Sequence, residues 1–227
     1  MADTRNGVAS ATRITVLISG SGSNLQAIIN ALNTPALPNA NIVKVISDRK
    51  SAYGLTRAQA AGIPTTHHGV LPYKKKFPDD SPDPQFQEAR RAYDADLAQL
   101  VLADSPDIVV CAGFMRILST AFLDPIKTSN TPIINLHPSL HGDLIGANCI
   151  EMAWNEFQAG KRTKTGIMIH YVIAEVDMGE PIVQEEIDMQ GCETLEALQE
   201  RIHMHEHGLI VKGAKIAIDA LEKAGKA

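Results

Sequence analysis

The sequence has few cysteines, little positive charge and no long apolar run, and each scarcity excludes a class of protein. Its three cysteines are an odd number without metal-site spacing, which argues against a disulfide framework or a structural zinc site and favours a reducing compartment. No segment approaches the roughly 18 apolar residues that indicate a membrane-spanning helix. The first residues, MADTRNGVAS, lack the apolar core of a secretory signal. We therefore expect a cytoplasmic protein without membrane association.

The net charge of −5 argues against broad basic surfaces that bind nucleic acid or anionic membranes. An anionic ligand would instead be bound by local features, such as a helix N-terminus or a single arginine. The 227 residues suffice for a full hydrophobic core, and the composition is that of an ordinary globular protein. We expect a disordered N-terminal tail over residues 1–12 and a single domain over residues 13–227.

Apolar strands alternate with amphipathic helices along the chain. Strands are predicted at residues 13–19, 41–47, 63–68, 105–113, 131–137, 164–173 and 179–187. Helices are predicted at residues 23–32, 53–62, about 85–103, about 147–157 and 195–224, and residues 69–84 are predicted as an irregular surface insertion. This order predicts an α/β, Rossmann-like three-layer fold with a mostly parallel sheet. The short link between the last two strands predicts antiparallel pairing and thus a mixed C-terminal edge.

A glycine-rich segment, SGSGSN at residues 19–24, lies between the first predicted strand and the following helix. Glycines allow a tight turn there, and the free N–H groups of a helix N-terminus attract an anion. The segment begins like the dinucleotide-binding pattern G-x-G-x-x-G, but Leu25 occupies the third glycine position. Ser23 and Asn24 offer a hydroxyl and an amide that suit a terminal phosphate. We favour phosphate binding, with dinucleotide binding and a purely structural turn as alternatives.

The segment INLHPSL, residues 134–140, ends an apolar strand with an amide, an imidazole and a hydroxyl. Asn135 and His137 are two residues apart, so in a strand they point the same way, into the cleft at the carboxyl ends of the strands. An amide beside a protonated imidazole can stabilise an oxyanion, and histidine also transfers protons near neutral pH. The alternative is a structural histidine. Ser139 lacks the G-x-S-x-G context of a nucleophile, so we do not expect a serine hydrolase.

Asp177 lies in the link AEVDMGEP between two predicted strands. A carboxylate near His137 would orient the imidazole and favour its protonated form. The sequence alone does not place the two residues together, and an aspartate in such a link often serves only the turn. Both interpretations stay open from the residues alone.

Four segments, in this order and spacing, resemble the phosphoribosylglycinamide formyltransferases, the folate-dependent enzymes of purine (IMP) biosynthesis. They are VLISGSGSNLQAII, DIVVCAGFMRIL, INLHPSL and VIAEVDMGEPIVQEE, and the likeness extends from about Ile14 to Ile216. TKTGIMIH and AWNEFQAGK are similar to the fungal branch of the family. The resemblance implies a Rossmann-like formyltransferase that moves a formyl group from 10-formyltetrahydrofolate, as co-substrate, to the amine of glycinamide ribonucleotide. It implies no metal ion and no covalent enzyme intermediate.

The resemblance also implies a role for each matching residue. Asn135, His137 and Asp177 match the family's catalytic trio, in which the first two would stabilise the oxyanion of a tetrahedral intermediate. The residues that would bind the ribonucleotide, chiefly its phosphate, are Gly22, Ser23, Asn24 and Glu206. The residues that would bind the folate are Arg90, Met115, Arg116, Ile117, Leu118, Asn135, Ile173, Ala174, Glu175, Val176 and Asp177. Arg91 is an alternative to Arg90 in the match.

One segment departs from the family's pattern. Family members usually carry a proline after His-Pro-Ser-Leu, whereas residues 141–146 of this chain are HGDLIG. We expect the departure to alter the shape of this loop and substrate affinity but not to touch the trio.

Three histidines near the C-terminus, His203, His205 and His207, raise the question of a metal. On a helix only His203 and His207 share a face, and no third ligand is evident, so we expect no metal site.

Other functions remain as alternatives. A formyltetrahydrofolate hydrolase would use the same trio on water but usually carries an extra N-terminal regulatory domain. A methionyl-tRNA formyltransferase normally carries an additional C-terminal β domain and binds tRNA. A non-catalytic phosphate- or nucleotide-binding module is the alternative from another class, and an NAD-dependent oxidoreductase is disfavoured by Leu25. We expect small-molecule substrates as partners, no nucleic acid, and a monomer or a homodimer.

Overall fold

The computed structural model describes residues 10–76 and 88–225. They contain a seven-stranded sheet in the order β3-β2-β1-β4-β5-β6-β7. The strands are β1 (Thr12–Ile18), β2 (Ala40–Ser47), β3 (Thr65–His67), β4 (Ile108–Cys111), β5 (Ile133–His137), β6 (Lys164–Tyr171) and β7 (Pro181–Asp188). The first five strands pair in parallel, whereas β6 pairs antiparallel with both β5 and β7. The predicted Rossmann-like α/β fold with a mixed C-terminal edge is confirmed.

The helices agree with the sequence-based prediction except in two places. They are α1 (Ser23–Ala31), α2 (Tyr53–Ala60), α3 (Leu71–Lys76), α4 (Glu88–Leu102), α5 (Thr120–Thr128), α6 (Cys149–Gln158) and α7 (Leu195–Lys223). Within the described part of the chain, none of these helices is both long and apolar enough to cross a membrane. Most of the expected N-terminal tail lies outside the described residues, and Thr12, assigned to it, already belongs to β1.

The first difference is α3, because we predicted residues 69–84 as irregular. Tyr73 of α3 packs beside Tyr93 of α4, with the two ring centroids 5.6 Å apart, and its hydroxyl donates to Asp96 at 2.6 Å. The prediction of an irregular segment was therefore wrong for Leu71–Lys76, where contact with α4 stabilises one helical turn. Residues 77–84 of the predicted insertion lie outside the described residues.

The second difference is α5, a helix that the sequence analysis did not assign. Pro125 lies inside it, and an internal proline removes one backbone donor and disfavours a helix. The helix nevertheless buries Phe122, Leu123 and Ile126 on one face. This burial against the sheet outweighs the cost of the proline.

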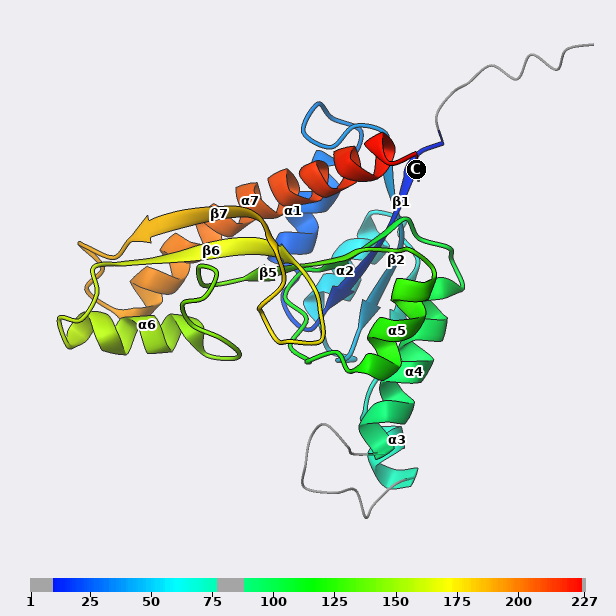
Figure 1. Cartoon of the computed structure of the whole chain (residues 1–227), viewed down its shortest axis with the longest axis horizontal. Helices are drawn as coiled ribbons and strands as arrows, with labels where there is room; N and C mark the ends of the chain where they lie inside the picture. The colour runs from blue at the N-terminus through cyan, green and yellow to red at the C-terminus, as the bar shows by residue number, and fades with distance from the viewer. Residues whose placement is uncertain (1–9, 77–87, 226–227) are drawn as a thin grey trace, which may run out of the picture.

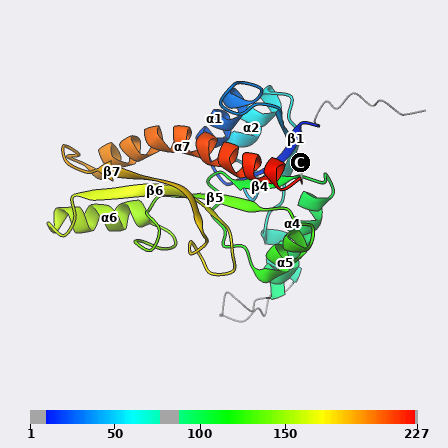
Figure 2. The ribbon, with the colours of Figure 1, turned by 45° about the horizontal axis from the view of Figure 1, so that its top comes forward.

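Alternate residues of the central strand supply two separate cores, one on each face of the sheet. Ile14, Val16 and Ile18 of β1 join a core with α1 and α7, whereas Leu17 joins a core with α4 and α5. Figures 1 and 2 show α4 and α5 on one side of the sheet and α1 and α7 on the other. The result is a three-layer arrangement around the parallel strands.

The antiparallel strands β6 and β7 extend away from the parallel part of the sheet, together with α6 and the first half of α7 (Figure 1). Thr194 caps the start of α7, because its hydroxyl accepts a hydrogen bond from the Ala197 N–H at 3.1 Å. From there α7 runs back across the sheet to α1 (Figure 1). This path brings residues near position 206 next to the glycine-rich loop after β1.

Candidate active site

The carboxyl ends of β1, β4 and β5 open into a cavity of about 620 Å³. Its walls come from the loops after β1 and β4, the end of β5, the segment before α6, the link between β6 and β7, and α7. Open α/β sheets bind their ligands at this position, and the volume is that of a small-molecule site.

The glycine-rich loop places a helix N-terminus at one end of the cavity. Gly22 precedes α1 with φ +71°, and a Cβ there would lie 2.5 Å from the Cα of Gly54, so the turn requires glycine. No side chain caps α1, and its first turn contains no acidic residue. The free N–H groups and the helix dipole therefore offer a site for an anion. Gly22 and Ser23 line the cavity, as predicted for phosphate binding.

Asn24 and Glu206 meet at this end of the cavity, although 182 positions separate them in the sequence. The Asn24 amide donates to Glu206 Oε2 at 3.0 Å, and both side chains are buried. No described group hydrogen-bonds to Oδ1, the side-chain amide oxygen of Asn24. Both residues line the cavity, so the structure brings together all four predicted ribonucleotide residues.

Asn135 and His137 project from the end of β5 into the middle of the cavity. The Nδ1 atom of His137 lies 3.5 Å from Asp177 Oδ2, so the three residues of the predicted trio are neighbours. The Nε2 atom of His137 lies 2.9 Å from the Leu144 carbonyl oxygen, which can only accept. Nε2 therefore carries a hydrogen, and a hydrogen on Nδ1 makes the ring cationic. Asp177 is the counter-ion for that form.

His170 is a fourth member of this group that the sequence analysis did not identify. It is buried on β6 directly opposite Asn135 of β5. Its Nε2 atom lies 3.2 Å from the Asn135 amide nitrogen and 3.6 Å from Asp177 Oδ1, and its Nδ1 donates to the Tyr171 carbonyl at 2.9 Å. The available signal was an imidazole within the otherwise apolar strand GIMIHYV.

The surroundings of Asp177 favour its ionised form. Burial alone would raise the pKa of Asp177, but the His170 ring 3.6 Å away, the hydrogen bond from the Gly146 N–H and the positive charge that either histidine carries when protonated together lower it. Asp177 adopts φ +56° in the link between β6 and β7. Gly179 follows so close to β6 that a Cβ would lie 1.6 Å from the Tyr171 carbonyl oxygen. This close approach holds the carboxylate against the two histidines.

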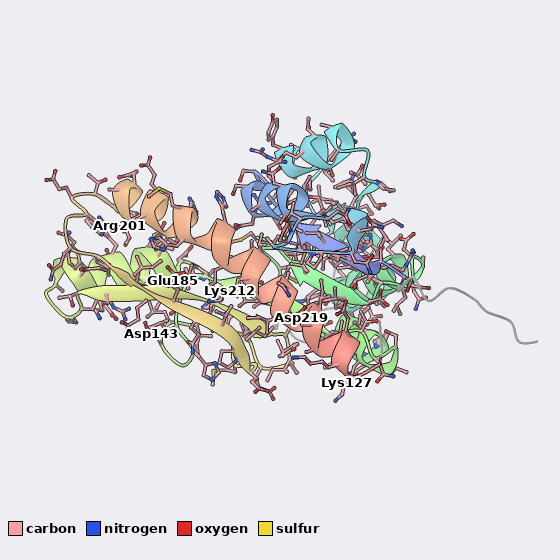
Figure 3. The ribbon with its side chains drawn as sticks, turned by 90° about the horizontal axis from the view of Figure 1, so that it is seen from above. Lys127, Asp143, Glu185, Arg201, Lys212 and Asp219 are labelled. Carbon is pink, nitrogen blue, oxygen red and sulfur yellow. The ribbon has the colours of Figure 1, made fainter. Side chains whose placement is uncertain are left out.

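The loop at residues 141–146 contacts the trio, contrary to our expectation. The Leu144 carbonyl accepts from His137, and the Gly146 N–H donates to Asp177 Oδ2 at 2.8 Å. Ser139 has a structural role, because its hydroxyl accepts from the Leu144 N–H at 2.9 Å. The loop is also fixed from outside, because Arg162 forms two hydrogen bonds of 2.9 Å with Asp143. Figure 3 labels the Asp143 side chain. The sequence departure therefore lies directly beside His137 of the predicted trio.

Most of the predicted folate residues line the same cavity. Met115, Arg116, Ile117 and Leu118 line the cavity, and Met115 and Ile117 remain 65% and 54% exposed, which leaves an apolar surface open to a ligand. From the link between β6 and β7, the lining residues are Ile173, Ala174, Val176 and Asp177. Glu175 and Arg90 are not among the lining residues, and the Arg90 guanidinium instead donates to the Ile117 carbonyl.

The three histidines of α7 that raised the question of a metal have different surroundings. His203 lines the cavity, whereas His205 Nδ1 lies 2.5 Å from Glu185 Oε1 on β7. Among residues 10–76 and 88–225, no three His, Cys, Asp or Glu side chains gather in a way that could hold a metal ion. The three cysteines are free and buried.

Known proteins resemble this chain over most of its length. The Formyl transferase family profile matches residues 12–213. The phosphoribosylglycinamide formyltransferase of Schizosaccharomyces pombe is 48% identical over 200 residues, which are 88% of this chain and 93% of that protein. The phosphoribosylglycinamide formyltransferase of Saccharomyces cerevisiae is 45% identical over 215 residues, which are 93% of this chain and 99% of that protein.

Solved structures show the same likeness. The phosphoribosylglycinamide formyltransferase from Bacillus halodurans matches with a TM-score of 0.76 and 29% identity, over 94% of this chain and 97% of that chain. Glycinamide ribonucleotide transformylase 1 from Symbiobacterium toebii matches with a TM-score of 0.73 and 32% identity, over 90% of this chain and 86% of that chain. By sequence profile, by relatives and by fold, the chain belongs to the formyl transferase family.

Proposed function

We propose that this protein transfers the formyl group of 10-formyltetrahydrofolate to the amine of glycinamide ribonucleotide, a step of purine biosynthesis. The observation that carries the proposal is that Asn135, His137 and Asp177 line the same cavity as the uncapped N-terminus of α1 and the exposed apolar side chains of Met115 and Ile117. The phosphate and the folate ring would occupy opposite ends, so the two reacting groups meet at the trio. Orientation of two substrates in this way supplies a large part of a rate acceleration.

The ribonucleotide end uses the main chain of the glycine-rich loop. The N–H groups at the start of α1 would bind the phosphate, with the Ser23 hydroxyl beside them. Glu206, held by Asn24 at 3.0 Å, would accept hydrogen bonds from hydroxyl or amine groups of the same substrate. The apolar surface of Met115 and Ile117 would pack against the pterin ring.

The formyl carbon is attacked by the substrate amine, and its carbonyl oxygen becomes an oxyanion. The Asn135 amide and the His137 ring are the donors that stabilise this charge. We assign the His137 donor to Nδ1, because Nε2 is already bound to the Leu144 carbonyl at 2.9 Å. The Nδ1–Asp177 separation of 3.5 Å exceeds an ordinary hydrogen bond and leaves that N–H available to the oxyanion.

The intermediate collapses when the carbon–nitrogen bond to the folate breaks. The attacking amine must lose a proton, and the departing folate nitrogen must gain one. Asp177 is ionised and lies beside both histidines, so it can accept the first proton and return it through water. This sequence balances without a metal ion or a covalent enzyme intermediate.

The test is an assay of purified protein with 10-formyltetrahydrofolate, with and without glycinamide ribonucleotide, followed by the absorbance of the folate product. Product that forms only with the ribonucleotide supports the transferase. Product without it identifies a hydrolase, and no product with either mixture contradicts the proposal. The free cysteines are consistent with a reducing compartment, and we assign the reaction to the cytoplasm.

A further inference from the structure

Four side chains from three different elements hold the loop at residues 113–119, which forms the apolar wall of the cavity. The Ser19 hydroxyl, after β1, accepts from the Met115 N–H at 2.9 Å. On α4, Asp94 accepts from the Ser119 N–H at 2.9 Å, and Arg90 donates to the Ile117 carbonyl. These three contacts hold the backbone of the loop. The fourth side chain, Asp48 at the end of β2, contacts the residue at the centre of the loop.

Arg116 lies at the centre of the loop and lines the cavity, and its guanidinium contacts Asp48. The Nε atom of Arg116 lies 2.8 Å from Asp48 Oδ2, and the guanidinium carbon lies 5.3 Å from the centroid of the Tyr93 ring. Asp48 follows β2 directly and does not line the cavity. An ion pair thus joins the centre of the loop, which follows β4, to the end of β2, two strands away in the sheet.

The pair is asymmetric in its burial. The Asp48 side chain is 3% exposed, whereas the Arg116 side chain is 33% exposed. Asp48 Oδ1 is buried and receives no hydrogen bond from any described group, so Arg116 is the cation that compensates this carboxylate. A buried carboxylate that loses its cation is costly, which makes any movement of Arg116 away from Asp48 unfavourable.

We infer that Asp48 is a positioning residue for folate binding, which acts through Arg116 to hold the 113–119 loop in its ligand-ready shape. It does not touch the substrate itself. The inference rests on the proposed function for the identity of the ligand, but the claim that Asp48 holds the loop rests on the ion pair alone. Preorganisation of a binding wall lowers the entropy lost when the ligand binds, so its loss weakens that ligand selectively.

Asp48→Asn is the direct test, because the side chain keeps its shape and loses its charge. Loss of this partly exposed pair is expected to raise the KM for 10-formyltetrahydrofolate roughly three- to tenfold. The kcat and the KM for glycinamide ribonucleotide should change by less than about twofold, because the trio and the α1 N-terminus are untouched. Amide hydrogen exchange of residues 113–119, measured without any ligand, should become faster.

Asp219→Asn is the matched control. Asp219 accepts from Lys215 at 2.7 Å near the C-terminal end of α7, away from the cavity (Figure 3). Its removal should leave both KM values and the exchange of the loop unchanged. Arg116→Gln and the double variant complete the test: if the two residues act as one pair, Asp48→Asn adds little once Arg116 is replaced.

Two outcomes would overturn the inference: unchanged loop exchange in folded Asp48→Asn, or KM effects that add independently in the double variant. If Asp48→Asn does not fold, Arg116→Gln tests the same pair from its exposed partner, and unchanged exchange there has the same consequence. A wild-type protein without formyl transfer would contradict the proposed function, while the ligand-free exchange measurement would still decide whether Asp48 holds the loop.

Discussion

The two ends of the reaction centre recognise charge by different means. At the glycine-rich loop, an anion would be bound by main-chain N–H groups at the start of α1, which has no side-chain cap and no acidic residue in its first turn. At the junction of β5 and β6, charge is carried by side chains, because Asp177 lies 3.5 Å from His137 and 3.6 Å from His170. Charge recognition would depend on backbone shape at the first end and on the protonation of side chains at the second.

This difference predicts different consequences of mutation. At the β5–β6 junction the groups that would act on the substrate are side chains, so their loss should appear in kcat. A residue of the glycine-rich loop acts through the turn that it permits, so its replacement should appear in the KM for one substrate.

His137→Ala should give the largest effect. It removes one oxyanion donor and the proton-carrying ring, so kcat should fall roughly 10³- to 10⁴-fold with little change in either KM. His67→Ala on β3 is the control, because His67 is exposed and does not line the cavity. Steady-state kinetics of both variants make the comparison, and turnover near the wild-type value in His137→Ala would refute the assigned role.

His170→Ala should have the next largest effect, through Asn135 and Asp177 rather than through substrate contact. Loss of the ring leaves the Asn135 amide without this acceptor, which costs about 1–3 kcal/mol, roughly a 5- to 150-fold decrease in kcat. His170→Gln retains an amide that can accept from Asn135 and should recover part of the loss. A decrease of equal size in both variants would mean that His170 does not act through this hydrogen bond.

Gly22→Ala should have a smaller effect, confined to the ribonucleotide. A Cβ at φ +71° costs about 1–2 kcal/mol, and contact with Gly54 forces the turn to shift, so the KM for glycinamide ribonucleotide should rise about tenfold. Gly62→Ala is a close control: Gly62 has the same φ of +71°, but its Cβ would meet no atom within 4 Å. If both variants lose stability but only Gly22→Ala loses affinity, backbone shape sets the phosphate site.

The sequence predicted the mostly parallel sheet, because alternation of apolar strands and amphipathic helices is a local pattern. It also predicted that Asn135 and His137 project together, because residues two apart in a strand point the same way. The family resemblance supplied Asp177 and Glu206, whose positions no local pattern could place. What stayed hidden was tertiary: α5 needs burial to offset Pro125, and His170 gains its role only from a cross-strand neighbour.

The 141–146 loop shows the same limit of prediction from sequence. The missing proline was visible in the sequence, but its consequence was not, because the Leu144 carbonyl and the Gly146 N–H contact the trio through backbone atoms. Backbone contacts leave no signature in residue identity. The positions of His137 and Asp177 therefore depend on the shape of the 141–146 loop, which the residue types alone do not indicate.

The smallest expected effect is a change in the pH dependence of stability on replacement of Asp177 by asparagine. The folded protein lowers the pKa of Asp177, so the carboxylate stabilises the fold above its ordinary pKa of about 3.9, and this contribution is lost as the pH falls through the lower folded value. The free energy of unfolding of the wild type, minus that of Asp177→Asn, should therefore decrease as the pH falls below about 3.9. Urea denaturation at several pH values measures it.

Asp94 on α4 is the matched control, with the opposite sign. Burial raises the pKa of Asp94 despite the hydrogen bond from Ser119 and the nearby Arg90 charge, so its protonated form is favoured in the fold. The wild type minus Asp94→Asn should therefore lose stability as the pH rises through the raised folded value, not as it falls. If both differences change in the same direction, the counter-ion role of Asp177 is wrong and the charge at the β5–β6 junction lies on another group.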